Sequence, residues 1–181
     1  GIAFAQSKEG LDITLTPEDV YKALAANPFG KPQTAKNWSD VNPALPAEPI
    51  SVYGPPTTSG TRDALAELIL EVGCKTDAAT AALKDSDKDK YKAICTEVRE
   101  DGAYIDGGEK DNLIVKKIAD NPKTIGVFGF SFLEENMDTL RGITMSGVEP
   151  TYANISDFSY PGARPLFMYV KKQHLNAIPG L

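Results

Sequence analysis

Four consecutive residues, Ser59, Gly60, Thr61 and Arg62, combine groups that could bind an anion. The two hydroxyls can donate hydrogen bonds, and the guanidinium fork matches phosphate or carboxylate oxygens. Gly60 has no side chain, so a ligand could approach the backbone closely at this position. The chemistry that suits these residue types is the binding of an oxyanion.

The residues around this tetrapeptide predict that it begins a helix. A β-prone run at residues 50–53 is broken by Gly54 and two prolines, and Ser59 is then a natural N-cap. The first N–H groups of a helix lack partners and carry the positive end of its dipole, which favours an anion. The helix should bury a stripe of residues at helical spacing and end at a left-handed glycine cap. These residues are Leu65, Leu68, Ile69 and Val72 for the stripe and Gly73 for the cap.

Two interpretations of the tetrapeptide stay open on these residues alone. Ser-Gly-Thr is also an ordinary capping sequence. However, a cap optimised for stability has Glu or Gln at the third helical position, and Arg62 stands there, where the helix dipole disfavours a cation. A bound anion would offset this mismatch, and so would the neighbouring Asp63.

Composition indicates one globular α/β domain. The chain has 181 residues, of which 41% are hydrophobic and 24% charged, and predicted strands alternate with predicted helices. No apolar run approaches the ~20 residues of a membrane span. A net charge of −6 without a basic stripe argues against nucleic acid as a partner, but not against a small anion.

Several elements can be predicted from local patterns. Strands are expected at residues 1–7, 11–15, 124–130 and 165–171, with a hairpin at 143–147. Thr16 followed by Pro17 should begin a helix, as should Asp111 or Asn112, and further helices are expected at 76–83, 87–99 and from residue 131. Residues 27–45 and 102–111 should be loops, the first of them held to the core by Trp38.

Other chemistries fit less well. The loop that follows Gly54 lacks the lysine of a nucleotide-binding P-loop, and the single histidine, His174, lies too far along the chain to suggest a base for Ser59. Two cysteines and one histidine are too few for a structural zinc site. Cys74 and Cys95 could form a disulfide or could be two unrelated buried thiols.

The hexapeptide Thr58–Asp63, preceded by a strand, resembles the phosphate-binding loop of periplasmic phosphate-binding proteins of ABC transporters. Further segments along the whole chain are similar to members of this family in the same order. They are GIAFAQSKEG, LTPEDVYKAL, NWSDVNP, DNLIVKKIADNP, TIGVFGFSFLEEN, GVEPTYANI and RPLFMYVKK.

This resemblance implies a type II periplasmic-binding-protein lobe, with a central mixed β-sheet flanked by helices. Residues 1–181 would be the second of two lobes, with the first lobe and the C-terminal helices missing. The implied function is capture of inorganic phosphate in the periplasm for import through a membrane permease, by a binding protein and not an enzyme. Another tetrahedral oxyanion such as sulfate, or a phosphate-ester enzyme using the same loop, are the alternatives.

The resemblance also implies the site. Ser59, Gly60, Thr61 and Arg62 would bind phosphate, and three residues would support them: Thr58, Asp63 and Asn112. Some members have an arginine four residues before the serine, where this chain has Pro55, so that role would pass to Arg62. The family favours the Cys74–Cys95 disulfide, and it implies no metal, no cofactor, no nucleic acid and no direct membrane insertion.

Overall fold

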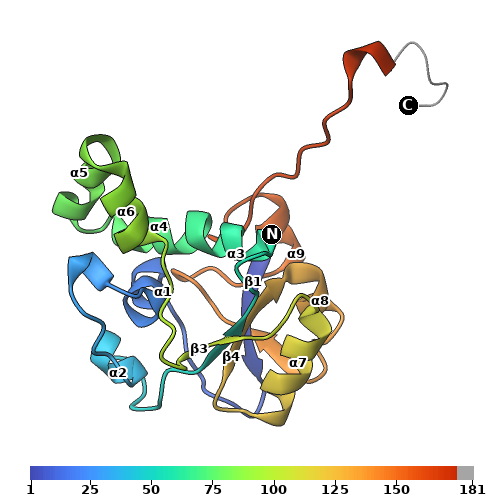
Figure 1. Cartoon of the computed structure of the whole chain (residues 1–181). Helices are drawn as coiled ribbons and strands as arrows, with labels where there is room; N and C mark the ends of the chain where they lie inside the picture. Colours follow the sequence, from blue (N-terminus) through green and yellow to red (C-terminus); the bar gives the residue numbers. More distant parts are fainter. Residues whose placement is uncertain (175–181) are drawn as a thin grey trace.

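A mixed five-stranded sheet organises residues 1–174, the part of the chain that the computed structural model describes (Figure 1). The strand order is β3-β2-β4-β1-β5. Strand β1 is antiparallel to its neighbours β4 and β5, whereas β2 is parallel to both β3 and β4. The strands are β1 (Ile2–Ser7), β2 (Val52–Gly54), β3 (Tyr104–Asp106), β4 (Ile125–Gly129) and β5 (Leu140–Gly142).

Helices cover both faces of the sheet because the side chains of its central strands alternate between two cores. Ile2 and Phe4 pack in a cluster with side chains of α1 (Pro17–Leu24) and α3 (Gly60–Leu65). Ala3 and Ala5 pack on the other face against α7 (Asp111–Asp120) and α8 (Phe130–Glu134). The expected α/β class, with a central mixed sheet flanked by helices, is confirmed.

The helix that begins at Gly60 is interrupted. A π-turn at Ala66–Leu70 separates α3 from α4 (Glu71–Cys74). The π-turn adds a residue to one turn, so the buried face moves by about one position. Leu65 and Ile69 are buried as expected, but Val72 is 46% exposed. The predicted C-cap at Gly73 is wrong, because this residue is buried inside α4.

Gly73 lies where α4 meets α1. A Cβ added to it would lie 2.3 Å from the carbonyl oxygen of Pro17 and 2.5 Å from Cβ of Tyr21. The glycine is therefore required by close helix packing and not by a left-handed turn.

The remaining helices surround this framework. Trp38, which begins α2, is 1% exposed, so its expected role in holding the loop to the core is confirmed. A disulfide between Cys74 and Cys95 joins α4 to α6, as the resemblance implied. The helices not yet bounded are the 3₁₀ turn η1 (Pro28–Gly30), α2 (Trp38–Val41), α5 (Ala78–Ser86), α6 (Lys88–Cys95), α9 (Tyr152–Ser156) and the 3₁₀ turn η3 (Lys172–His174).

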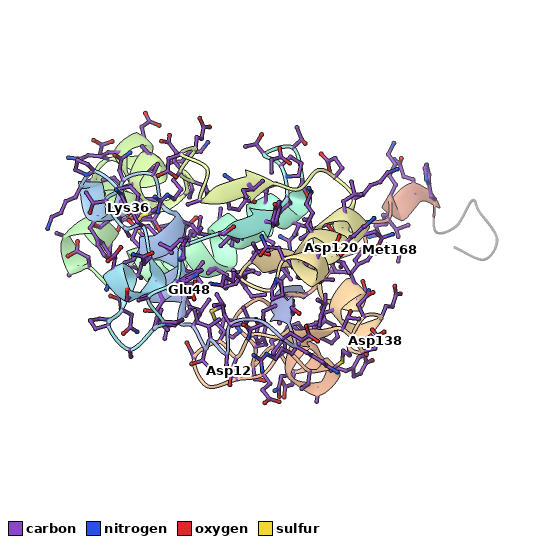
Figure 2. All side chains as sticks on the ribbon, turned by 90° about the horizontal axis from the view of Figure 1, so that it is seen from below. Asp12, Lys36, Glu48, Asp120, Asp138 and Met168 are labelled. Carbon is purple, nitrogen blue, oxygen red and sulfur yellow. A yellow bond between two sulfur atoms is a disulfide. The ribbon has the colours of Figure 1, made fainter. Side chains whose placement is uncertain are left out.

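Two predicted strands are wrong. Residues 11–15 bury Ile13 and Leu15, but both edges of nearby β1 are already paired, and only Leu15 forms a single bridge, to Met145. Residues 165–171 form no strand and extend away from the body of the protein (Figure 1). Met168 of this segment is 92% exposed, and it lies on the side of the protein where the chain leaves the body (Figure 2). In both segments the apolar residues have no neighbouring strand to complete a ladder.

Candidate anion-binding site

Three parallel strands end at one edge of the sheet, and a helix follows each of them. The helices α3, α7 and α8 begin after β2, β3 and β4 respectively. Strands β2 and β4 are neighbours, but β2 connects onward to β3 on one side and β4 connects onward to β5 on the other, so the connections that leave β2 and β4 diverge at this edge. Crevices at such reversal points are where open α/β sheets bind ligands.

Ser59 caps α3 as predicted. Its backbone is extended, with φ −87° and ψ 135°, and its Oγ accepts the N–H of Thr61 at 3.2 Å. The Arg62 N–H bonds to the carbonyl of Ser59 at 2.9 Å. Among residues 1–174, the N–H of Gly60 has no acceptor, so it is the donor left open in this first turn.

Gly60 is open to its surroundings. A Cβ added there would meet no protein atom within 4 Å, and the backbone is not in a left-handed conformation. The fold itself therefore does not require glycine at this position. The missing side chain leaves the unpaired N–H accessible to a ligand.

Two hollows meet at this turn. One, of about 390 Å³, lies between α3 and α8 and is lined by Gly60, Thr61 and Ser131, among others. The other, of about 350 Å³, lies toward α7 and is lined by Ser59, Thr61 and Asn112, among others. Thr61 borders both hollows. The structure thus brings together four of the residues named from sequence: Ser59, Gly60, Thr61 and Asn112.

Arg62 lies elsewhere. Its guanidinium stacks over the ring of Tyr104, 4.6 Å from the centroid, and its Nη1 is 3.5 Å from the carbonyl oxygen of Pro55. The Tyr104 hydroxyl donates to the same carbonyl at 2.7 Å. Burial raises the pKa of Tyr104, and the nearby Arg62 charge opposes this effect. A helix turns by about 100° per residue, so Arg62 projects away from the face that carries Gly60.

Thr58 and Asp63, the other supporting candidates, also lie outside the two hollows. The Thr58 hydroxyl donates to the carboxylate of Glu109, which connects the loop after β2 to the loop after β3. Asp63 is exposed and borders a separate hollow that it shares with Arg62.

Sequence reasoning missed three residues at this edge. Ser131 lies two residues after the end of β4, so the rule for parallel strands could have identified it. The carboxylate of Asp111 accepts the Gly129 N–H at 3.0 Å and joins the loops after β3 and β4. Arg164 comes from a distant part of the chain, and no local pattern places it here.

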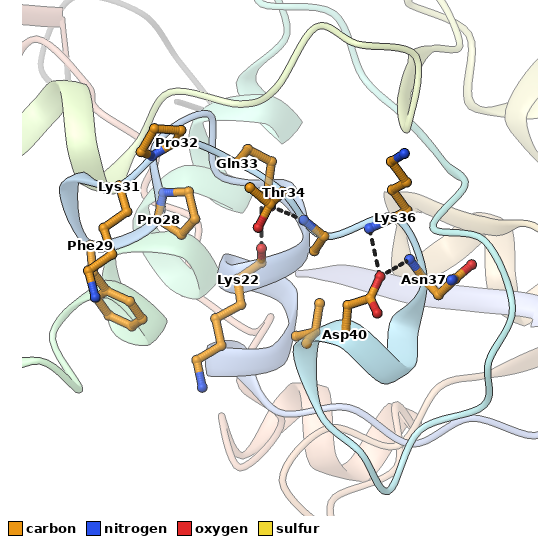
Figure 3. Close-up of a pocket in the computed structure, with 12 residues that line it drawn as sticks. Lys22, Pro28, Phe29, Lys31, Pro32, Gln33, Thr34, Lys36, Asn37 and Asp40 are labelled. Carbon is orange, nitrogen blue, oxygen red and sulfur yellow. Dashed lines mark hydrogen bonds between the residues drawn. The ribbon is translucent and has the colours of Figure 1, made fainter.

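Another hollow lies on a different part of the surface, between η1 and α2, and has a volume of about 700 Å³ (Figure 3). Lys22, Lys31 and Lys36 line it, together with Asp40. The Asp40 carboxylate accepts the backbone N–H of Lys36 at 2.9 Å, so it serves the local backbone. None of the site residues named from sequence borders this hollow.

Within residues 1–174, no cluster of His, Cys, Asp and Glu could hold a metal ion. In the same part of the chain, no helix is both long and apolar enough to cross a bilayer.

Comparison with known proteins identifies the family. A family model described as "PBP superfamily domain" matches residues 1–181. The phosphate-binding protein PstS of Staphylococcus haemolyticus is 28% identical over 180 residues, which cover 95% of this chain and 48% of that protein. PstS of Staphylococcus saprophyticus is 32% identical over 146 residues, which cover 78% of this chain and 37% of that protein. The chain therefore spans less than half the length of these curated relatives.

A solved structure agrees on the fold. A possible phosphate binding protein from Planctomyces limnophilus superposes with a TM-score of 0.63 at 23% identity, over 88% of this chain and 48% of that one. The expected fold, a lobe of the periplasmic-binding-protein type, is confirmed by this match. This chain therefore belongs to the family described as the PBP superfamily domain.

Proposed function

We propose that this chain is the phosphate-contacting part of the solute-binding component of an ABC transporter that imports inorganic phosphate. The observation that carries the proposal is the open Gly60: its N–H has no acceptor among residues 1–174, and no protein atom approaches its Cβ position. It lies at a helix N-terminus, where backbone donors and the dipole favour an anion. The similarity to proteins named as phosphate-binding supports phosphate as that anion.

In this mechanism the first turn of α3 supplies the hydrogen bonds. The N–H group of Gly60 and the hydroxyls of Ser59 and Thr61 donate to phosphate oxygens. Hydrogen bonds to a charged acceptor are worth about 1.5–3 kcal/mol each. The Asn112 amide borders the same hollow and supports the ligand, while Arg62 adds positive charge from its place over Tyr104.

Thr58 and Asp63 support the site less directly. Thr58 holds the binding loop to Glu109. Asp63 balances the charge of Arg62 at the start of the helix, where the two residues border one hollow.

Binding, not catalysis, is the role that the loop supports. The Ser59 hydroxyl oxygen already accepts the N–H of Thr61 as the helix cap, which suits a fixed ligand donor better than a nucleophile. The proposed location is the periplasm, and the Cys74–Cys95 disulfide is typical of such an oxidising compartment. There a membrane permease of the transporter would be the protein partner.

We also infer that residues 1–181 are the second of two lobes, which the coverage of 48% of the S. haemolyticus protein supports. Two lobes closing over phosphate would exclude water and strengthen each charged hydrogen bond. By itself this chain should then bind phosphate weakly, with a dissociation constant on the order of millimolar.

Titration followed by amide NMR tests the proposal. Phosphate should produce saturable shifts centred on Gly60, Thr61 and Arg62, and sulfate should produce smaller ones. Shifts centred elsewhere would refute the site, and tighter binding of sulfate would refute the assignment to phosphate. Turnover of a phosphomonoester in the same sample would favour the enzyme alternative.

A further inference from the structure

We infer that Arg164, and not Arg62, supplies the cationic side chain that faces the anion bound at Gly60 and Thr61. This inference rests on the proposed function and assigns a binding residue within the same site. The two arginines differ in the hollow that each borders, in their charged surroundings and in their contacts.

Backbone contacts fix the segment that carries Arg164. The Ile2 N–H donates to the carbonyl of Gly162 at 2.8 Å, and a Cβ on Gly162 would lie only 2.3 Å from the carbonyl oxygen of Ile2. The buried Tyr160 donates its hydroxyl to the carbonyl of Ile143 at 3.2 Å. Residues 160–164 therefore pack tightly on the start of β1.

This anchor delivers Arg164 to the carboxyl edge of the sheet. Strand β1 is antiparallel to β4, and Ile2 pairs with Gly129, the last residue of β4. The start of β1 thus lies beside the beginning of α8. Arg164 borders the hollow between α3 and α8 together with Gly60, Thr61 and Ser131.

The hollow has the charge that an anion requires. Among the described residues, Arg164 is the only charged side chain that lines it, and no carboxylate does. Nη1 of Arg164 lies 3.6 Å from the Glu67 carboxylate, which is 66% exposed. Such an exposed contact is screened by solvent, and at this distance it is too long for a hydrogen bond.

Arg62 differs from Arg164 in its contacts and in its charged surroundings. Its guanidinium is held over Tyr104 and near the Pro55 carbonyl. Arg62 borders two hollows, and both mix acidic with basic side chains. One is lined by Asp63, Glu97, Glu100 and Lys92, and the other by Glu100, Asp106 and Arg99. An anion in either of these hollows would meet carboxylates, whereas an anion beside Arg164 would meet the Gly60 N–H and two hydroxyls.

The test compares two matched substitutions in the full 181-residue chain, Arg164→Gln and Arg62→Gln. Phosphate titration is followed at the Gly60 and Thr61 amides. Loss of a charge-assisted pair should raise the dissociation constant roughly tenfold or more in Arg164→Gln. Arg62→Gln should change it by about twofold or less, as expected for a charge beyond direct contact. Arg164→Lys should lie between wild type and Arg164→Gln, because lysine keeps the charge but not the fork.

Two additions make the result decisive. Gly1 lines the same hollow, so its α-amino group is a second positive charge there. Acetylation removes that charge, and the acetylated chain should still show the same contrast between the variants. The Nε–H signal of Arg164 in the unsubstituted chain should shift with phosphate, and that of Arg62 should not; this measurement does not depend on whether a variant folds.

The inference is overturned if Arg62→Gln weakens binding more than Arg164→Gln, or if only the Arg62 signal moves. If the unsubstituted chain binds phosphate and Arg164→Gln binds it equally well, the inference alone is wrong. If the unsubstituted chain shows no saturable shift at Gly60 and Thr61, the proposed function itself is wrong.

Discussion

Replacement of Gly73 by alanine should destabilise the fold at a point remote from the proposed site. The added Cβ would lie 2.3 Å from the Pro17 carbonyl oxygen and 2.5 Å from Cβ of Tyr21. Ordinary contacts between carbon atoms are about 3.5–4.0 Å, so α1 and α4 would have to separate by roughly 1 Å. The disulfide at Cys74 restrains α4 against this movement.

The magnitude follows from two opposing effects. Overpacking costs about 1–3 kcal/mol, and the upper part of this range applies because the Pro17 contact is with backbone. Alanine in a helix recovers about 1 kcal/mol relative to glycine. The net loss in free energy of unfolding should be about 2 kcal/mol, which lowers Tm by about 4–8 °C in a chain of this size.

Urea unfolding and thermal unfolding, both followed by circular dichroism, measure this loss. Gly60→Ala is the matched control, because a Cβ at Gly60 meets no atom within 4 Å and should leave stability unchanged or slightly raised. If Gly73→Ala is as stable as the unsubstituted chain, the helices tolerate the methyl group and the packing argument is wrong.

Three further predictions concern the site, the disulfide and the response to acid. Gly60→Ala should weaken phosphate binding at the Thr61 amide about tenfold, since a methyl group would stand where the ligand approaches; unchanged titration curves would contradict this. Replacing both Cys74 and Cys95 by serine should lower the free energy of unfolding by about 3 kcal/mol for a separation of 21 residues, and equal urea midpoints would count against it. The Arg99 guanidinium donates a hydrogen bond to the Asp101 carboxylate and lowers its pKa. This pair therefore stabilises the folded state above the usual carboxyl pKa, and the stabilisation is lost as the pH falls through the lowered value. Asp101→Asn should therefore flatten the fall in unfolding free energy below about pH 4, which urea titrations at several pH values would show.

Local signals predicted the elements that depend on neighbours in sequence. The Thr16 cap and the Ser59 cap are both present, because capping is decided within three residues. Strands β1 and β4 are also present, because their side chains are buried nearly throughout. Residues 102–111 were expected to form a loop, yet they contain β3, which pairs with the distant strand β2.

The candidate site likewise contains residues that local sequence predicts and residues that only long-range contacts place there. Ser59, Gly60 and Thr61 lie in one turn, so their proximity was predictable from sequence. Arg62 is adjacent in sequence but projects from another side of the helix and contacts Tyr104. Arg164 reaches the hollow only because the start of β1 and the carbonyl of Gly162 are hydrogen-bonded, which no local pattern encodes.

The π-turn at Ala66–Leu70 has a consequence for insertions and deletions in this lobe. Removing one residue from it would restore a regular helix and rotate everything after it by about 100°. Cys74 would then face away from Cys95, and Gly73 would no longer lie against α1. The extra residue is thus tied to the disulfide and to the glycine contact. A homologue that loses it would have to change all three features together.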